Sequence, residues 1–321
     1  MKIKNRQINK ELRFTGILTR IFLPFFTEKT FKLFNWMYNF NFKGKCKSKI
    51  NYEQKWITRP DQSKLRICVY SPKNRQENVP GLLWMHGGGY AFGVPEQDEA
   101  AIKKFIEAAG CIVVSPDYRR SLECPFPAAL EDCYAALLWL RDHAAEYKIR
   151  SDQLMIGGFS AGGGLTAALA LYARDKKEVA IAFQMPLYPM LDDRMETESS
   201  KNNDAPLWNS KSNYLGWKLY LGNLFKTNNV PFYASPARAQ NFKNLPPTVS
   251  FVGSIEPFRD ETINYMDKLR ENNIPVYFKI YEGCFHAFDW MAPKSKISKE
   301  ATAFLIETFK FAVDHYIAKQ P

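Results

Sequence analysis

Apolar and polar positions follow two alternating patterns from about residue 80 onward. Short apolar runs typical of buried strands alternate with segments whose apolar residues recur at helical spacing. The expected strands cover residues 82–85, 111–115, 153–157, 180–187, 248–252 and 275–281, and the expected helices cover residues 98–109, 128–143, 165–174, 260–272 and 298–318. This alternation indicates an α/β fold with a mostly parallel sheet, helices on both faces, and reactive loops at the carboxyl ends of the strands.

Three segments depart from the alternation. Residues 52–70 hold two β-rich runs around a Pro-Asp-Gln-Ser turn, which predicts a hairpin at a sheet edge. Residues 192–230 are polar and lack a strand pattern, which indicates a helical insertion over the sheet. Apolar stripes around Ile17 and Phe34 predict two short amphipathic helices near the N-terminus. The resulting division is a cap segment (1–50), a first core part (51–191), a cap insertion (192–230) and a second core part (231–321).

The net charge of +11 is concentrated at the N-terminus. Residues 1–50 hold twelve Lys or Arg and two Glu, which leaves 32 basic and 31 acidic residues in the rest of the chain. A nearly neutral body argues against binding to nucleic acid. The uncharged stretch 33–42 is shorter than the roughly 17–25 apolar residues of a membrane-spanning helix, so we expect neither a span nor a signal peptide. We favour a lid on the protein's own surface, with weak contact to a membrane surface as the alternative.

The number and spacing of the cysteines indicate a protein of a reducing compartment, in which cysteines stay free. Their spacing is irregular and contains no C-x-x-C pair, so neither a disulfide scaffold nor a zinc site is expected. We expect a cytoplasmic protein without a metal or a cofactor, and a homodimer is left open. The six residues are Cys46, Cys68, Cys111, Cys124, Cys133 and Cys284.

The pattern G-x-S-x-G at residues 158–162 lies between a predicted strand and a predicted helix, with Ser160 at its centre. A serine on so sharp a turn projects from the top of a sheet and is a candidate nucleophile. Glycine-rich turns before helices also bind phosphate, but here no Gly-Lys-Ser/Thr ends the loop. A nucleophilic serine needs a base and a group that orients the base.

A second glycine cluster, Gly87, Gly88 and Gly89, directly follows the apolar strand 82–85. Successive glycines leave backbone N–H groups uncovered by side chains, as an oxyanion hole requires. A plain glycine-rich loop is the alternative, and the downstream G-x-S-x-G pattern favours the oxyanion hole.

Among four histidines, only His286 lies on a loop after a late strand, where an α/β hydrolase carries its general base. The ring of His86 is expected to support the glycine loop. His143 and His315 lie in or at the ends of predicted helices.

Two acidic residues after strand 248–252 are candidates for the group that orients the base. The position of Glu256, close to the strand end, favours it. Asp260 suits the start of the next helix, and both residues remain open at this point.

The sequence strongly resembles the hormone-sensitive-lipase-like carboxylesterases, a branch of the α/β hydrolases. The matching motifs are residues 86–90 (HGGGY), 117–119 (DYR), 125–132 (PFPAALED), 158–163 (GFSAGG), 188–189 (YP), 256–261 (EPFRDE) and 283–288 (GCFHAF). The family usually has Asp where Glu256 lies and Asp or Thr where Phe159 lies, so two positions depart from its pattern.

The resemblance implies an α/β-hydrolase fold with an eight-stranded sheet and a helical cap built from the N-terminus and the insertion. It implies Ser160 as nucleophile, His286 as base and an oxyanion hole from the N–H groups of Gly88, Gly89 and Ala161. Asp117 and Asp132, which also lie in shared motifs, are expected to hold loops.

The expected function is a serine carboxylesterase that hydrolyses short- to medium-chain acyl esters of small molecules through an acyl-enzyme. The alternatives are a deacetylase of sugars or small metabolites, an amidase, a lipase, or a binding protein that has lost its reaction. Because both Ser160 and His286 are present, an enzyme is favoured.

Overall fold

The computed structural model describes residues 1–59, 61–74 and 76–321. Its strands are β1 (Asn51–Thr58), β2 (Lys64–Ser71), β3 (Val79–Met85), β4 (Ile112–Pro116), β5 (Ile149–Phe159), β6 (Phe183–Leu187), β7 (Thr248–Gly253) and β8 (Val276–Tyr281). Its α-helices are α1 (Arg13–Phe22), α2 (Glu28–Asn41), α3 (Glu99–Ala109), α4 (Ala128–Asp142), α5 (Ala161–Lys176), α6 (Ser210–Leu221), α7 (Arg259–Glu271), α8 (Phe288–Met291) and α9 (Lys296–His315).

Within the described residues, the strands form one eight-stranded sheet in the order β1-β2-β4-β3-β5-β6-β7-β8. β2 runs antiparallel to β1 and β4, and the remaining neighbours are parallel. The expected mostly parallel sheet and its edge hairpin are therefore confirmed, although Pro60 in the predicted turn lies outside the described residues.

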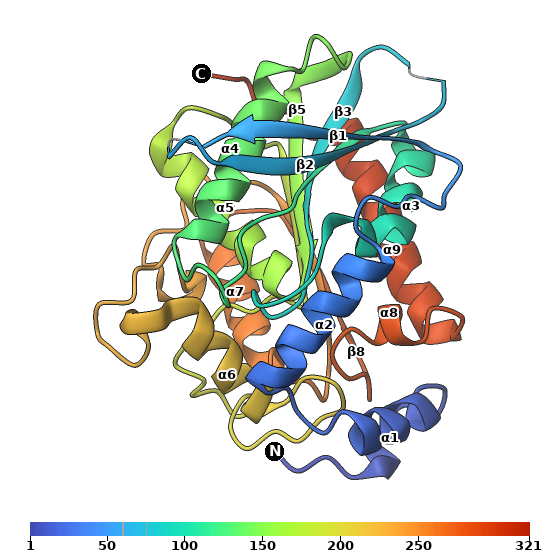
Figure 1. The fold of residues 1–321 in the computed structure, drawn as a ribbon, viewed down its shortest axis with the longest axis vertical. Helices are drawn as coiled ribbons and strands as arrows, with labels where there is room; N and C mark the ends of the chain where they lie inside the picture. The colour runs from blue at the N-terminus through green and yellow to red at the C-terminus, as the bar shows by residue number, and fades with distance from the viewer. Residues whose placement is uncertain (60, 75) are drawn as a thin grey trace.

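The unbroken apolar run of β3 is explained by burial on both faces of the sheet. Leu83 and Met85 pack in the core beneath α4 and α5, whereas Leu82 and Trp84 pack in a second core with α3 and α9. The two pairs of helices lie on opposite sides of the strands (Figure 1). Because both faces are covered, the carboxyl ends of the parallel strands are the part of the sheet left for a site.

The N-terminal segment and the insertion lie against each other. The N–H of Ile3 donates to Asp204 Oδ1 at 2.7 Å, and the N–H of Phe26 donates to Ser212 Oγ at 2.9 Å. The ring of Phe26 packs 5.5 Å from that of Trp208. These contacts fit a cap assembled from two distant parts of the chain, while its exact boundaries stay a prediction.

The two amphipathic helices expected near the N-terminus are present as α1 and α2. The insertion is less helical than expected, because α6 covers only twelve of its residues and much of the remainder is irregular. The four-residue α8 is absent from the expected elements. Among the described residues, no helix combines the length and apolar character needed to cross a membrane.

Candidate active site

Ser160 lies on a strained turn at the end of β5. Its φ of 57° and ψ of −116° are unfavourable for a residue with a side chain, so the surrounding packing must hold the turn. A Cβ atom at Gly158 would lie 2.4 Å from the carbonyl oxygen of Met85, and one at Gly162 would lie 2.1 Å from the same atom. Glycine at both positions therefore lets the turn pack directly against the end of β3.

The predicted base and one of its two candidate partners converge on Ser160. The Ser160 hydroxyl donates to His286 Nε2 at 2.7 Å, and His286 Nδ1–H donates to Glu256 Oε2 at 2.5 Å. The other oxygen of Glu256 accepts the N–H of Gly253 at 2.7 Å. The exposed fractions of Ser160, His286 and Glu256 are 7%, 3% and 0%. The structure thus brings together a hydroxyl, an imidazole and a carboxylate from the ends of three strands.

Asp260, the other candidate acid, is bound elsewhere. Its Oδ2 accepts the N–H of Ser199 at 2.7 Å, and its Oδ1 accepts Arg259 Nε–H at 2.7 Å. The Asp260 N–H in turn donates to Ser199 Oγ at 3.0 Å. Asp260 is the second residue of α7, so it fastens the start of this helix to the insertion, as its helix-start position suggested.

Aromatic side chains enclose the His286 ring. The rings of Tyr188 and Phe258 meet it edge-on with centroids at 5.1 Å each, and the indole of Trp208 lies at 6.2 Å. These neighbours restrict the orientation of the imidazole. The sequence did not assign them to the site, although residues 188–189 form one of the matching motifs, because nothing local indicates which ring they approach.

The glycine loop follows β3 and borders the same cavity as Ser160 and His286. Gly88 has a φ of +124°, and a Cβ atom there would lie 2.0 Å from the carbonyl oxygen of Phe92, so only glycine fits. Within the described residues, the N–H groups of Gly88, Gly89 and Ala161 donate no hydrogen bond to another protein group. They are therefore available to a bound molecule.

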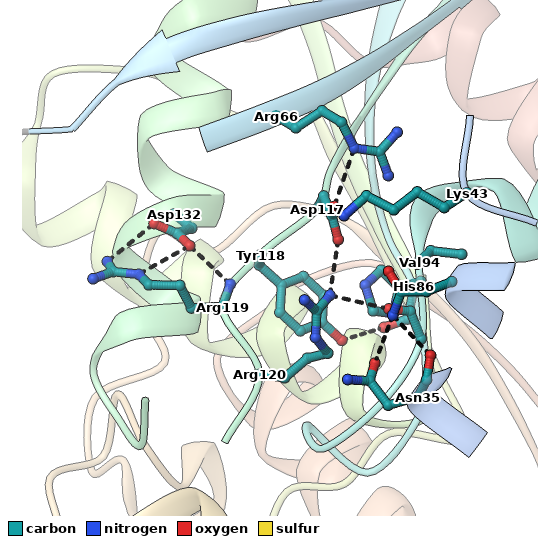
Figure 2. A network of polar contacts seen from close by, with 12 residues as sticks. Asn35, Lys43, Arg66, His86, Val94, Asp117, Tyr118, Arg119, Arg120 and Asp132 are labelled. Atoms are coloured by element: carbon teal, nitrogen blue, oxygen red, sulfur yellow. Dashed lines mark hydrogen bonds and ion pairs between the residues drawn. The ribbon is translucent and has the colours of Figure 1, made fainter. Parts of the chain in front are cut away.

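The side chains of His86 and Tyr118 pack together and hold the start of the glycine loop (Figure 2). The Tyr118 hydroxyl donates to the carbonyl oxygen of His86 at 2.7 Å, and the two rings stack with centroids 4.2 Å apart. His86 Nδ1–H donates to the carbonyl oxygen of Gly87 at 2.8 Å. Complete burial lowers the pKa of His86 to about 4, so its ring is neutral near pH 7 and acts as a structural support.

Asp117 binds three cations (Figure 2). Its carboxylate contacts Arg66 at 3.1 Å, Arg120 at 2.9 Å and Lys43 at 3.0 Å. Burial alone would raise the pKa of Asp117, but the charges of Arg120, Arg66 and Lys43 lower it to about 2. Because Lys43 follows α2, this cluster links the N-terminal segment to the loop after β4.

Asp132 binds two arginines. It accepts Arg59 Nε–H at 2.6 Å, and it accepts both the backbone N–H of Arg119, at 2.8 Å, and the guanidinium of Arg119. Figure 2 shows the contact with Arg119. These bonds join α4 to the loop after β4 and to the β1–β2 hairpin, so Asp132 holds loops as expected.

The two remaining histidines contact their own helices. His143 Nδ1–H donates to the carbonyl oxygen of Trp139 at 2.9 Å, and His315 Nδ1–H donates to that of Phe311 at 2.8 Å. Both bonds join residues four positions apart, which fits the structural roles expected for these histidines.

A cavity of about 330 Å³ opens beside Ser160. Its walls are largely apolar and come from the glycine loop, the insertion, α8 and the inner sides of α1 and α2. The lining residues include Thr19, Leu23, Phe26, Phe34, Tyr38, Phe92, Asp98, Phe159, Tyr188, Leu207, Trp208, Trp290 and Met291. The N-terminal segment therefore covers the candidate site, in agreement with the favoured lid interpretation.

Asp98 is a carboxyl in this apolar wall that sequence reasoning treated only as the start of a helix. It is 4% exposed, and its Oδ2 accepts Trp84 Nε1–H at 2.9 Å. Burial raises the pKa of Asp98 to about 7 against the effect of the Trp84 bond, and the charge of Asp289 adds to the rise. Burial also raises the pKa of Asp289, to about 6.

Comparisons with known proteins identify the family of the chain. A family model described as alpha/beta hydrolase fold matches residues 82–289, well over half of the chain. The chain belongs to this family. The match spans the glycine loop and all three residues of the Ser160–His286–Glu256 contact, and the hormone-sensitive-lipase-like branch suggested by the motifs is confirmed.

Several proteins that are similar to this chain are esterases by name. The chain is 32% identical to Esterase LipI of Mycobacterium tuberculosis over 228 residues, which cover 71% of each chain. It is 33% identical to an arylesterase of Saccharolobus solfataricus over 228 residues, covering 70% of this chain and 72% of the relative. Among solved structures, a bacterial heroin esterase superposes with a TM-score of 0.86 at 31% identity, covering 96% and 98% of the two chains.

The two candidate acids are distinguished by a pair of isosteric substitutions. Glu256→Gln removes the charge that orients His286, and we expect kcat/KM for an ester substrate to fall by about 10² to 10⁴. Asp260→Asn keeps an oxygen for the Ser199 N–H and should change kcat/KM by less than about threefold. Steady-state kinetics of both variants measure this, and loss of activity in Asp260→Asn alone would contradict the assignment.

The buried Asp98 carboxyl predicts a pH-dependent stability. The pKa of Asp98 is higher in the folded than in the unfolded protein. The contribution of this carboxyl to the free energy of unfolding is therefore complete below about pH 4 and is lost as the pH rises through about 7. Replacing it by Asn should stabilise the protein relative to wild type as the pH rises across this window, by at most about 1.4 kcal/mol per pH unit. Urea unfolding at several pH values measures the slope.

Asp314→Asn, at an exposed position in α9, is the matched control for this substitution. It should leave the difference from wild type independent of pH. If the free energy of unfolding changed with pH in the same way in wild type and in Asp98→Asn, the predicted role of the buried carboxyl would be contradicted.

Proposed function

We propose that this carboxylic ester hydrolase is a serine esterase in which Ser160 is the nucleophile, His286 the general base and Glu256 the group that orients the base. The observation that carries the proposal is the unbroken series of hydrogen bonds from Ser160 through His286 to Glu256. It is supported by burial of all three side chains and by the family to which the chain belongs.

In the first half of the reaction, His286 Nε2 removes the proton from the Ser160 hydroxyl as Oγ attacks the ester carbonyl carbon. The carbonyl π-bond opens and its electron pair moves onto the oxygen, which becomes an oxyanion. The tetrahedral intermediate then collapses, the bond to the alcohol oxygen breaks, and the imidazolium donates its proton to the leaving alcohol. The product is an acyl group bound to Ser160.

In the second half, water takes the place of the alcohol. His286 removes a proton from the water as its oxygen attacks the acyl carbon, and a second oxyanion forms. When this intermediate collapses, the bond to Ser160 Oγ breaks, the serine recovers its proton from His286, and the carboxylic acid leaves. The Glu256 carboxylate accepts Nδ1–H, which keeps Nε2 free to accept protons in both halves.

The oxyanion of each intermediate is assigned to the N–H groups of Gly88, Gly89 and Ala161. Three features support this assignment: the free donors, the position of the glycine loop beside Ser160, and the His86–Tyr118 support that fixes the loop. A rigid set of donors needs no reorganisation when charge develops on the substrate, and one such donor typically contributes about 10² to 10³ in rate.

The cavity indicates the class of ester. Its aromatic and aliphatic walls offer few hydrogen-bond partners, so they suit an apolar acyl or alkoxy group of modest size. A sugar would leave hydroxyl groups unpaired against such walls, at a free-energy cost for each group. This favours short- to medium-chain acyl esters over acetylated sugars.

Substituting Ser160 by Ala tests the nucleophile. Hydrolysis of p-nitrophenyl esters should fall by about 10⁴ to 10⁶, because no other group at this position can form the acyl-enzyme. Ser121→Ala is a matched control, since Ser121 is also 7% exposed and its hydroxyl has no protein partner among the described residues. The control should retain activity, and unaltered turnover in a folded Ser160→Ala variant would exclude the mechanism.

A graded substrate series tests the class of ester. We expect kcat/KM to be highest for p-nitrophenyl esters of short to medium acyl chains, lower for long chains that exceed the cavity, and low for an acetylated sugar and an anilide. Preference for the acetylated sugar would instead identify a deacetylase.

A further inference from the structure

The outer sides of α1 and α2 carry large apolar residues that stay exposed in the described part of the chain. In α1 these are Phe14, Leu18, Ile21 and Phe22, and in α2 they are Leu33, Trp36, Met37 and Phe40. The exposed fractions reach 81% at Phe22 in α1 and 67% at Phe40 in α2. Apolar side chains concentrated in this way on a soluble surface usually mark an interaction site.

These residues are distinct from those that make the lid. The inner sides of the same helices supply Thr19, Phe34 and Tyr38 to the wall of the cavity. In α2, the exposed residues 33, 36, 37 and 40 follow helical spacing and form one continuous stripe. The lid function therefore accounts for the inner sides alone and leaves the outer stripes unexplained.

The exposed stripe of α2 is also basic. Lys29 and Lys32 are exposed and lie one helical turn before Leu33 and Trp36 on the same side. Residues 1–50 contain twelve basic and two acidic residues, whereas the rest of the chain is nearly neutral. Helices that combine apolar residues, aromatic rings and lysines on an exposed side are typical of segments that lie in the plane of a membrane interface.

We propose that the outer sides of α1 and α2 dock onto the surface of an anionic lipid bilayer. The helices would lie parallel to the surface, with the apolar stripes at the boundary between headgroups and acyl chains and the lysines among anionic headgroups. Their lengths of ten and fourteen residues suit this arrangement, and neither helix is long enough to span a bilayer.

Charge favours a lipid surface over a second copy of the chain. A two-fold symmetric contact places the same surface of both copies together, so it would bring two strongly basic segments into contact. Like charges at such an interface oppose association, whereas anionic headgroups complement the segment. Apolar contact alone would fit either partner, so the charge decides between them.

Docking has a consequence for the substrate, and this consequence rests on the proposed esterase function. Because α1 and α2 also form a wall of the cavity, the surface that contacts lipid is the outer side of the same helices that enclose the proposed nucleophile. Esters with apolar acyl chains partition into bilayers, so a docked enzyme meets them at a higher local concentration than in water.

Vesicle co-sedimentation tests the docking directly. The Ser160→Ala variant, in the full-length chain, is mixed with vesicles of phosphatidylcholine alone or of phosphatidylcholine with phosphatidylglycerol. We expect binding to the anionic vesicles, and weakening of this binding at high salt, which screens the lysines. Because the variant lacks the nucleophile, the result does not depend on whether the esterase mechanism is correct.

Two double variants, made in the Ser160→Ala background, identify the surface. Lys29→Glu with Lys32→Glu should lower the partition coefficient by roughly tenfold or more, and Trp36→Ser with Phe40→Ser should lower it similarly. Trp56→Ser is the matched control, because Trp56 is 58% exposed but lies on β1, outside the cap. All substituted side chains are exposed, so far-ultraviolet circular dichroism and thermal unfolding should match those of the parent variant.

Two outcomes would overturn the proposal. The first is absence of binding to anionic vesicles, or binding that is equal for the parent variant and both double variants. The second is a dimer in sedimentation velocity that dissociates in Trp36→Ser with Phe40→Ser, which would make this surface an interface between copies of the chain.

Discussion

The site depends on how the His286 ring is held between a hydroxyl and a carboxylate. Ser160 follows β5, Glu256 follows β7 and His286 follows β8, so each group comes from the carboxyl end of a different parallel strand. The imidazole has two distinct ring nitrogens, and here both are used, Nε2 toward Ser160 and Nδ1 toward Glu256. The register of the sheet and the core on both of its faces therefore have a direct chemical consequence, because they fix three groups that lie far apart in the sequence.

Such a site is unfavourable in isolation. Glu256 is fully buried, and Ser160 has a backbone conformation that side chains disfavour. The fold compensates locally, since the Gly253 N–H and the imidazole satisfy the carboxylate, and glycines on both sides of Ser160 remove the steric conflict with β3. The ion clusters around Asp117 and Asp132 make a similar contribution at the loop after β4, where each buried carboxylate is matched by at least two cations.

Local patterns predicted the sheet, Ser160, the glycine loop and His286, because each depends on residues adjacent in the sequence. The choice between Glu256 and Asp260 required the structure, since both follow β7 and the deciding partner of Asp260, Ser199, lies about sixty residues earlier. The enclosure of His286 by Tyr188, Trp208 and Phe258 is likewise tertiary and leaves no local pattern. The four-residue α8 and the irregular insertion lack the repeated spacing on which a helix prediction depends.

The packing of the Met85 carbonyl oxygen, at the end of β3, has a further consequence. It contacts the turn around Ser160 from one side, and the residue that follows it begins the glycine loop. The proposed nucleophile, Ser160 Oγ, and the proposed anion-binding N–H groups of the glycine loop are thus positioned by the same backbone atoms at the end of β3. A displacement of the end of β3 would therefore move both groups, whereas a substitution in the outer wall of the cavity can change which acyl group fits without altering the distance between them.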